Sequence, residues 1–345
     1  MRWRHGLAEA GGMAAATERL MEGILGGERA ALARGITLVE STHPGRAEQA
    51  RLLVNSLTER NKRAGVGSFR LGLSGPPGAG KSTFMEAAGK RLTAAGHRVA
   101  VLAVDPSSGT TGGSLLGDKT RMPELTVDPR AYIRPSPSRG HLGGVTRTTN
   151  EAIILCEAAG YDLVLVETVG VGQSEYMVRD MVDAFLLILP PAGGDELQGI
   201  KRGIVEQSDL IVVNKCDGDL VSSAQRVAYE YMSALKYLRP RSPLWRPRVK
   251  LCSSLPPYTG LPEVLEEIAE YRRVLEESGE LEGRRAAQHQ RWMWSYVEER
   301  LVGLARAARG GEVRELEAAV REGRVSPGSA ADMVINKFLQ DSKAS

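Results

Sequence analysis

The sequence has 345 residues, of which 42% are hydrophobic and 25% charged, and its formal net charge is +3. These proportions are those of an ordinary globular chain, and the length can hold one large α/β domain with helical additions or two modest domains. Basic and acidic residues are interleaved along the sequence, which gives no case for a nucleic-acid-binding protein. No apolar run approaches the roughly 18 residues that a membrane-spanning helix needs.

The first 66 residues are predicted to be helical. Leu20, Ile24 and Leu32 recur at helical spacing, as do Leu53 and Leu57. The pattern is broken by the Pro and Gly at 42–45 and ends at the glycines of 64–67.

Between residues 67 and 260 the pattern changes to short apolar runs separated by helix-length segments. Continuous apolar character indicates strands that are covered on both faces, as in a parallel sheet. The runs lie at 69–74, 99–104, 163–168, 184–189, 210–214 and 249–252. We therefore predict an α/β domain with a three-layer, doubly wound, mostly parallel sheet.

Residues 261–345 carry no strand signal and are predicted to form helices at 261–277, 283–308, 312–321 and from 327 onward. An apolar stripe begins at Trp292, Met293 and Trp294 and continues through Val297, Leu301 and Leu304. Such a stripe is typical of a core or of a helix–helix contact. The three cysteines Cys156, Cys216 and Cys252 are widely spaced, which argues against a disulfide framework and favours buried thiols in a reducing compartment.

A phosphate-binding loop follows the first predicted strand. The pattern G-x-x-x-x-G-K-[ST] is fitted by Gly75, Pro76, Pro77, Gly78, Ala79, Gly80, Lys81 and Ser82. These residues and Thr83, near which a helix is expected to begin, are the predicted nucleotide-binding residues. Glycines let backbone N–H groups converge on phosphate oxygens, and the helix N-terminus adds partial positive charge. Lys81 is expected to contact the β- and γ-phosphates, and the Ser82 hydroxyl to ligate Mg²⁺.

A P-loop enzyme also needs a carboxylate near its Mg²⁺. Asp105 and Glu167 each stand at the end of a predicted strand, and Asp118 lies on the loop between those strands. Spacing alone leaves these three candidates open.

Residues 167–170 read Glu-Thr-Val-Gly, where many GTPases have D-x-x-G, so Gly170 is the candidate sensor of the γ-phosphate. The next position often carries a glutamine that orients the attacking water. Here it is Val171, which cannot hydrogen-bond to water. We therefore predict slow intrinsic hydrolysis.

Asn214, Lys215, Cys216 and Asp217 follow the predicted strand at 210–214 and fit the pattern N-K-x-D. The Asp217 carboxylate can accept hydrogen bonds from the N1–H and the N2 amino group of guanine, and adenine has neither donor there. Ser253, Ser254 and Leu255, after the last predicted strand, are expected to contact the guanine edge through their backbone. The base is thus predicted to be guanine.

With these motifs, the sequence closely resembles the methylmalonic aciduria type A and MeaB-type family of GTPase chaperones of adenosylcobalamin-dependent methylmalonyl-CoA mutase. The segments that carry the resemblance are 36–42, 104–108, 113–122, 132–139, 143–151, 167–175 and 190–203, and more loosely 292–294 and 326–328. The resemblance implies a P-loop GTPase fold of the SIMIBI class. It also implies that Asp105, Asp118 and Glu167 surround Mg²⁺.

The resemblance further implies a third switch at 193–202, in which Asp195, Glu196, Gln198 and Lys201 relay the nucleotide state to the mutase. The family gates the loading of adenosylcobalamin, which reaches it only through the partner, and protects the mutase from oxidative inactivation. Its C-terminal helices form a homodimerisation arm. The location implied is the mitochondrial matrix in a eukaryote and the cytoplasm otherwise, although the N-terminus has no clear transit peptide. Ser254 departs from the alanine that is common in the family.

Two other functions stay open. A nickel-insertion metallochaperone GTPase would need His-rich or Cys-containing motifs, but the five histidines are scattered, at 5, 43, 97, 141 and 289. A nucleotide-driven transport or partitioning ATPase is opposed by the Asn214–Asp217 pattern, which selects guanine.

Overall fold

The computed structural model describes residues 11–41, 43–65, 67–104, 121–134, 142–168, 174–191, 202–307 and 311–344. By its internal contacts the chain divides into two compact units, Met1–Gln288 and His289–Ser345.

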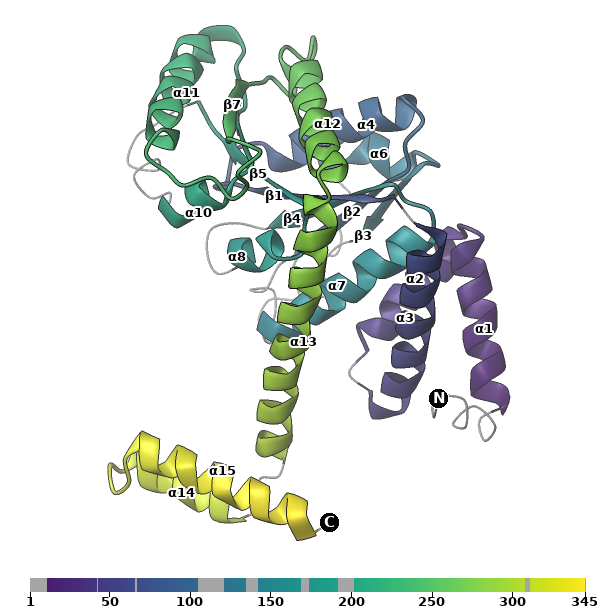
Figure 1. The fold of residues 1–345 in the computed structure, drawn as a ribbon, viewed down its shortest axis with the longest axis vertical. Coiled ribbons are helices and arrows are strands. Elements are labelled where there is room, and N and C mark those ends of the chain that lie inside the picture. The colour runs from purple at the N-terminus through teal and green to yellow at the C-terminus, as the bar shows by residue number, and fades with distance from the viewer. Residues whose placement is uncertain are drawn as a thin grey trace. The chain divides into compact units, whose positions relative to one another are not determined.

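The first unit is built on a seven-stranded sheet in the order β3-β2-β4-β1-β5-β6-β7 (Figure 1). Its strands are β1 (Phe69–Ser74), β2 (Val99–Val104), β3 (Ala131–Arg134), β4 (Leu163–Thr168), β5 (Ala184–Leu189), β6 (Leu210–Val213) and β7 (Arg248–Leu251). Every neighbouring pair is parallel. The α/β prediction is confirmed, and all the carboxyl ends of the strands meet at one edge, where such sheets bind ligands.

The predicted strands agree with the observed ones to within one residue at each end, and β3 is an additional strand. The runs at 210–214 and 249–252 are observed as Leu210–Val213 and Arg248–Leu251. β3 has only four residues and ends in Arg134, so its apolar run is too short to indicate a strand by itself.

One face of the sheet is covered by α4 (Lys81–Ala94), α6 (Pro123–Val127) and α12 (Leu261–Glu277). Phe84, Leu125 and Val264 from these helices belong to one buried cluster with Leu71 and Leu73 of β1. The core thus includes α12, although its sequence lies in the segment predicted as a C-terminal helical region. The division of the sequence at 66 and 260 stays a prediction.

The other face is covered by α7 (Leu142–Ala158), α8 (Ser174–Arg179) and α10 (Arg202–Gln207) (Figure 1). α8 lies very close to β1, because a Cβ atom at Gly72 would lie 2.9 Å from Val182 Cγ2 and 3.0 Å from Val178 Cγ1. The remaining helix of the sheet domain, α11 (Val221–Leu235), follows a short 3-10 turn (Gly218–Leu220) and packs along β6 and β7.

Three N-terminal helices form a layer against α7. They are α1 (Gly11–Leu25), α2 (Arg29–Val39) and α3 (Pro44–Ala64). Gly35 of α2 lets the helices approach closely, since a Cβ atom there would lie 2.9 Å from Leu155 Cδ2 of α7. Arg134, at the end of β3, pairs with Glu40 just after α2, and this ion pair joins the helical layer to the sheet.

A buried ionic network lies at the amino-terminal ends of the strands. Arg70 forms two hydrogen bonds with Glu157 of α7, at 2.7 and 3.0 Å, and both side chains are buried. Asp183, before β5, pairs at 2.5 Å with Arg285 of α13 (Glu280–Ala307). The network fixes the first turns of α13 to the sheet.

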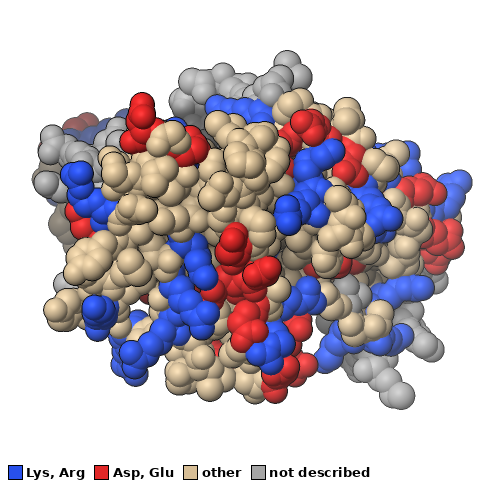
Figure 2. Space-filling view, turned by 90° about the horizontal axis from the view of Figure 1, so that it is seen from above, with Lys and Arg blue, Asp and Glu red and all other residues tan. Residues whose placement is uncertain are grey.

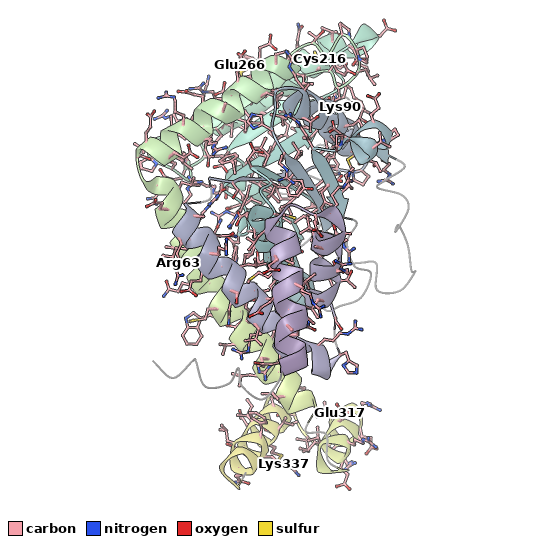
Figure 3. The ribbon with its side chains drawn as sticks, turned by 90° about the vertical axis from the view of Figure 1, so that its right-hand side faces the viewer. Arg63, Lys90, Cys216, Glu266, Glu317 and Lys337 are labelled. Atoms are coloured by element: carbon pink, nitrogen blue, oxygen red, sulfur yellow. The ribbon has the colours of Figure 1, made fainter. Side chains whose placement is uncertain are left out.

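The second unit contains the rest of α13, α14 (Gly311–Arg321) and α15 (Pro327–Ala344). The last two helices pack side by side, as Figure 3 shows with Glu317 and Lys337 on neighbouring helices. Ser326 caps α15, because its hydroxyl accepts a hydrogen bond from the N–H of Ser329 at 3.1 Å.

Candidate nucleotide-binding site

The phosphate loop joins the end of β1 to the start of α4, and its backbone fits only glycine at two places. A Cβ atom at Gly75 would lie 2.0 Å from the carbonyl oxygen of Ile188 in β5. Gly80 has a φ of 87°, and a Cβ atom there would lie 2.6 Å from Asn214 Nδ2. The loop therefore lies in close contact with the end of β5 and with Asn214, directly after β6.

Lys81 is the first residue of α4, and its side chain is buried. Its Nζ donates hydrogen bonds to the carbonyl oxygens of Gly75 at 2.7 Å and Pro76 at 3.2 Å. The ammonium group is thus folded back over the loop, where it can meet an anion bound by the loop N–H groups.

Ser82 and Glu167 bring oxygen ligands together across the edge of the sheet. Ser82 Oγ lies 3.4 Å from Glu167 Oε1, although the two residues stand 85 positions apart in the sequence. Glu167 is near the end of β4 and is only 5% exposed. A hydroxyl and a buried carboxylate at this distance have the oxygen chemistry that Mg²⁺ prefers, so these residues fit that ion.

The next residue, Thr168, makes a contact that the sequence did not reveal. Its Oγ1 lies 3.0 Å from the hydroxyl of Ser74, and both side chains are fully or almost fully buried. This hydrogen bond fixes the end of β4 to the last residue of β1. The hydrogen bond therefore fixes the position of Glu167 relative to the phosphate loop.

The base loop begins directly after β6, and Asn214 connects it to the phosphate loop. Asn214 Nδ2 donates to the carbonyl oxygens of Ala79 at 3.0 Å and Gly80 at 3.4 Å. Its N–H donates to Leu189 O at 2.8 Å, which fixes it to β5. Lys215 follows in the left-handed region with a φ of 58°, and this turns the chain out along the edge of the sheet.

Asp217 is half-buried, and its carboxylate is oriented by the segment after β7. Oδ2 accepts a hydrogen bond from Ser253 Oγ at 2.5 Å. Cys216, shown in Figure 3, donates its N–H to Cys252 O at 3.0 Å, which brings the two loops together. Burial, and secondarily the Asp217 carboxylate, raise the pKa of the Cys216 thiol, so this thiol stays protonated at neutral pH.

The segment 253–255 has one uncommitted amide. The N–H of Ser253 donates to Thr259 O at 2.8 Å, and that of Leu255 to Ser253 Oγ at 3.2 Å. The Ser254 hydroxyl donates to Asn214 Oδ1 at 2.8 Å. Within the described part of the chain, the N–H of Ser254 makes no hydrogen bond, so it can donate to an acceptor beside Asp217.

The structure therefore brings the phosphate loop, Glu167, the 214–217 loop and the 253–255 segment to one edge of the sheet. Seven of the residues expected at the site lie outside the described residues: Asp105, Asp118, Gly170, Asp195, Glu196, Gln198 and Lys201.

Comparison with known proteins places this arrangement in a family. Residues 32–310 match the family model described as methylmalonyl-CoA mutase-associated GTPase MeaB. The chain belongs to the MeaB family. It is accordingly a GTPase that binds guanine nucleotides. Membership of this GTPase family argues against the nucleotide-driven ATPase considered from the sequence.

Named relatives cover nearly all of this MeaB-family chain. It is 54% identical over 331 residues to the mitochondrial methylmalonic aciduria type A homolog of Mus musculus, covering 93% of this chain and 79% of the relative. It is 52% identical over 317 residues to a putative GTPase of Caulobacter vibrioides, covering 91% and 95%.

A solved structure described as an LAO/AO transport system kinase has a TM-score of 0.74 and 37% identity to the chain. The match covers 94% of this chain and 98% of that one. Among the helices of the described residues, none has both the length and the apolar character to span a bilayer.

Proposed function

We propose that the protein is a Mg²⁺-dependent GTPase switch that gates the loading of adenosylcobalamin into methylmalonyl-CoA mutase and protects that enzyme. The observation that carries the proposal is the match of residues 32–310 to a family described as mutase-associated GTPases. The protein would act in the mitochondrial matrix of a eukaryote or in the cytoplasm of a bacterium.

Guanine is proposed to bind between the two loops that meet at Cys216 and Cys252. Asp217 accepts from N1–H and the N2 amino group, and the uncommitted N–H of Ser254 donates to O6. Asn214 acts as a positioning residue, because its amide connects Ala79 of the phosphate loop to Ser254 of the base-binding segment. Adenine would place an acceptor at N1 against the Asp217 carboxylate, which accounts for selectivity.

The phosphates are proposed to bind the N–H groups of Gly78 and of residues 80–83, with Lys81 on the β- and γ-phosphates; Pro76 and Pro77 have no N–H, and that of Ala79 donates to Pro76 O at 3.2 Å. Ser82 and Glu167 would hold Mg²⁺ together with Asp105 and Asp118, directly or through water. When bound there, Mg²⁺ would supply positive charge that offsets the negative charge developing on the phosphates during hydrolysis. Lys81 adds a positive charge from a buried position, where the effective dielectric constant is low.

Hydrolysis is proposed to be slow in the isolated protein, because Val171 replaces the glutamine that orients water in many GTPases. The γ-phosphate would be sensed by Gly170, and Asp195, Glu196, Gln198 and Lys201 would transmit its presence to the mutase. The group that completes the hydrolytic site would then be supplied by another residue of the chain or by the partner on association.

A homodimer is proposed to form through α13. Trp294, Val297, Leu301 and Leu304 follow the 3-4-3 spacing of a coiled-coil seam, and each is at least 39% exposed in the single chain. A row of large apolar side chains of this kind is typical of an interface.

The proposal is tested by capturing purified adenosylcobalamin-free mutase on the immobilised protein with GTP, with GDP and without nucleotide, and by following transfer of adenosylcobalamin to the mutase. We expect association in at least one state, and loading that depends on the nucleotide. Asp217→Ala is the matched variant, since it removes guanine binding but changes only one half-buried side chain. Failure to associate in all three states would contradict the mutase role and leave the GTPase activity standing.

A further inference from the structure

One stretch of the first unit differs sharply in charge from the rest of the chain. Residues 221–251 contain seven basic residues and one acidic residue, so their net charge is +6, against +3 for all 345 residues. The basic residues are Arg226, Lys236, Arg239, Arg241, Arg246, Arg248 and Lys250, and the acidic residue is Glu230. In this stretch, therefore, basic residues are not balanced by neighbouring acidic residues as they are over the whole sequence.

Only some of these cations are neutralised within the fold. Arg241 pairs with the buried Asp209 at 2.6 Å. Arg248 and Lys250 share the single carboxylate of Glu267, at 2.5 and 2.8 Å. Lys236, Arg239 and Arg246 have no carboxylate of the described residues within ion-pair distance. An excess of positive charge therefore remains between the end of α11 and the start of β7.

A groove lies between these two elements. It has a volume of about 450 Å³ and is lined by Met232, Leu235, Leu238 and Val249, with Lys236 and Arg246 also along its wall. Figure 2 looks onto the top of the molecule as drawn in Figure 1, and on its left uncharged residues form a broad area that has both Lys or Arg and Asp or Glu at its border. An apolar groove bordered by unpaired cations can hold a ligand with both apolar and anionic groups.

The strand beside the groove has a free edge. β7 is the last strand of the sheet and pairs only with β6 among the described strands. Cys252 donates its N–H to Val213 O at 2.9 Å. Every second residue of a strand turns its backbone groups to the same side, so those of Lys250 face β6 and those of Val249 face away from it. Within the described residues, Val249 makes no backbone hydrogen bond outside the sheet pairing. Its N–H and C=O can therefore bind an extended peptide.

The exposed face of α11 next to the groove carries interface-type side chains. Tyr229 is 70% exposed and Met232 45%, and with Lys236, which follows the last residue of the helix, they have the i, i+3, i+7 spacing of one helix face. Tyr237, just after the helix, is 85% exposed. Aromatic residues and Met are enriched in protein interfaces, whereas a surface that only contacts water has no need of them.

We propose that this groove, called the α11–β7 groove, binds an acidic peptide segment of a partner protein. An apolar side chain of the segment enters between Met232 and Val249, and flanking carboxylates pair with Lys236 and Arg246. The aliphatic lining favours a peptide over a nucleic acid, whose backbone offers no side chain of this kind. The groove shares no residue with the nucleotide-binding site, so the proposal stands independently of the proposed function.

The test uses the full-length protein with GDP and a short fluorescein-labelled peptide that alternates Asp or Glu with Leu or Val. Fluorescence anisotropy at physiological salt gives the Kd. We expect Lys236→Glu with Arg246→Glu to weaken binding by about tenfold or more, because carboxylates would then face carboxylates. Met232→Glu should weaken it as well, through the apolar lining. Hydrogen exchange should show protection of the Val249 amide when the peptide binds.

Arg226→Glu is the matched control, because it reverses an exposed charge on the same helix outside the groove lining. We expect a change of less than about twofold there, since only distant charge is altered. The proposal would be overturned if Arg226→Glu lost as much peptide affinity as the groove variants. It would also be overturned if the protein bound polyglutamate as tightly as the peptide, or bound single-stranded DNA more tightly. GTP hydrolysis should be the same in all variants, which shows that they fold and separates this result from the nucleotide site.

Discussion

The side-chain amide of Asn214 donates a hydrogen bond to the carbonyl oxygen of Ala79 at 3.0 Å. Through this contact, a loop that follows β6 holds the loop that follows β1, although 135 positions separate the two residues. The same side chain accepts a hydrogen bond from Ser254 at 2.8 Å. One buried residue therefore connects the phosphate-binding and base-binding parts of the site.

Replacing Asn214 by Ala should loosen both loops. The substitution leaves the carbonyl of Ala79 and the hydroxyl of Ser254 without their partner, and we expect a loss of about 1–3 kcal/mol in the free energy of unfolding. GDP affinity, measured by calorimetry, should fall with it. Ser254→Ala removes one of these bonds and should have a smaller effect on both quantities. Equal effects of the two variants would show that the contact to Ala79 contributes nothing.

Removing the hydroxyl of Ser82 should change the Mg²⁺ requirement of GTP binding. Ser82→Ala deletes one proposed ligand, and we expect the Mg²⁺ concentration for half-maximal hydrolysis to rise by about 10- to 100-fold. Arg91→Ala is the control on the same helix, because Arg91 is exposed and lies outside the phosphate loop. Unchanged Mg²⁺ dependence in Ser82→Ala would contradict the proposed ligand set.

The backbone at Gly75 should tolerate no side chain. A Cβ atom would lie 2.0 Å from Ile188 O, so Gly75→Ala must displace the loop or β5. We expect a loss of about 3 kcal/mol in stability, measured by urea unfolding, together with loss of nucleotide binding. At Gly78 a Cβ atom would meet nothing within 4 Å, and φ is 78°. Gly78→Ala should therefore lose only about 1 kcal/mol, from the left-handed backbone.

The buried Arg70–Glu157 pair should make stability depend on acid pH. Burial raises the pKa of Glu157, but the Arg70 charge and the hydrogen bonds from Arg70 and Ser68 outweigh it, so the net pKa is lowered. A lowered pKa means that this contribution is complete above the unfolded value of about 4.3 and is lost as pH falls through the folded value.

Glu157→Gln removes that acid-dependent part and leaves Arg70 without its ion partner, which should lower stability by about 3–5 kcal/mol at neutral pH. Urea unfolding at neutral and acidic pH measures both effects. Glu59→Gln breaks an exposed pair with Arg63 and should change stability by less than about 1 kcal/mol. A Glu157→Gln protein whose stability falls with acid as steeply as the parent protein would rule out this role for Glu157.

Much of the fold can be predicted from the sequence, because parallel strands buried on both faces leave continuous apolar runs. Leu163–Thr168 and Ala184–Leu189 are evident in this way, and so is the phosphate loop between β1 and α4. β3 is not, since four residues carry too little pattern.

Contacts between distant residues could not be predicted. Three hydrogen bonds join polar side chains that nothing in the surrounding sequence connects. They are those of Thr168 with Ser74, Asp217 with Ser253 and Asn214 with Ser254. The same holds for the ion pairs of Arg70 with Glu157 and of Asp183 with Arg285. Only the three-dimensional order of the strands and helices brings these partners together. The basic stretch at 221–251 is concealed because whole-chain composition averages over it.

One site is proposed to bind phosphates at Lys81 and to select guanine at Asp217. The most direct measurement compares the affinities of GDP and ADP, by calorimetry with Mg²⁺, for the parent protein and for Asp217→Ala. The parent protein should strongly prefer GDP, and Asp217→Ala should lose most of that preference because the N1–H and amino donors lose their acceptor. A variant that keeps the full preference for GDP would contradict the account.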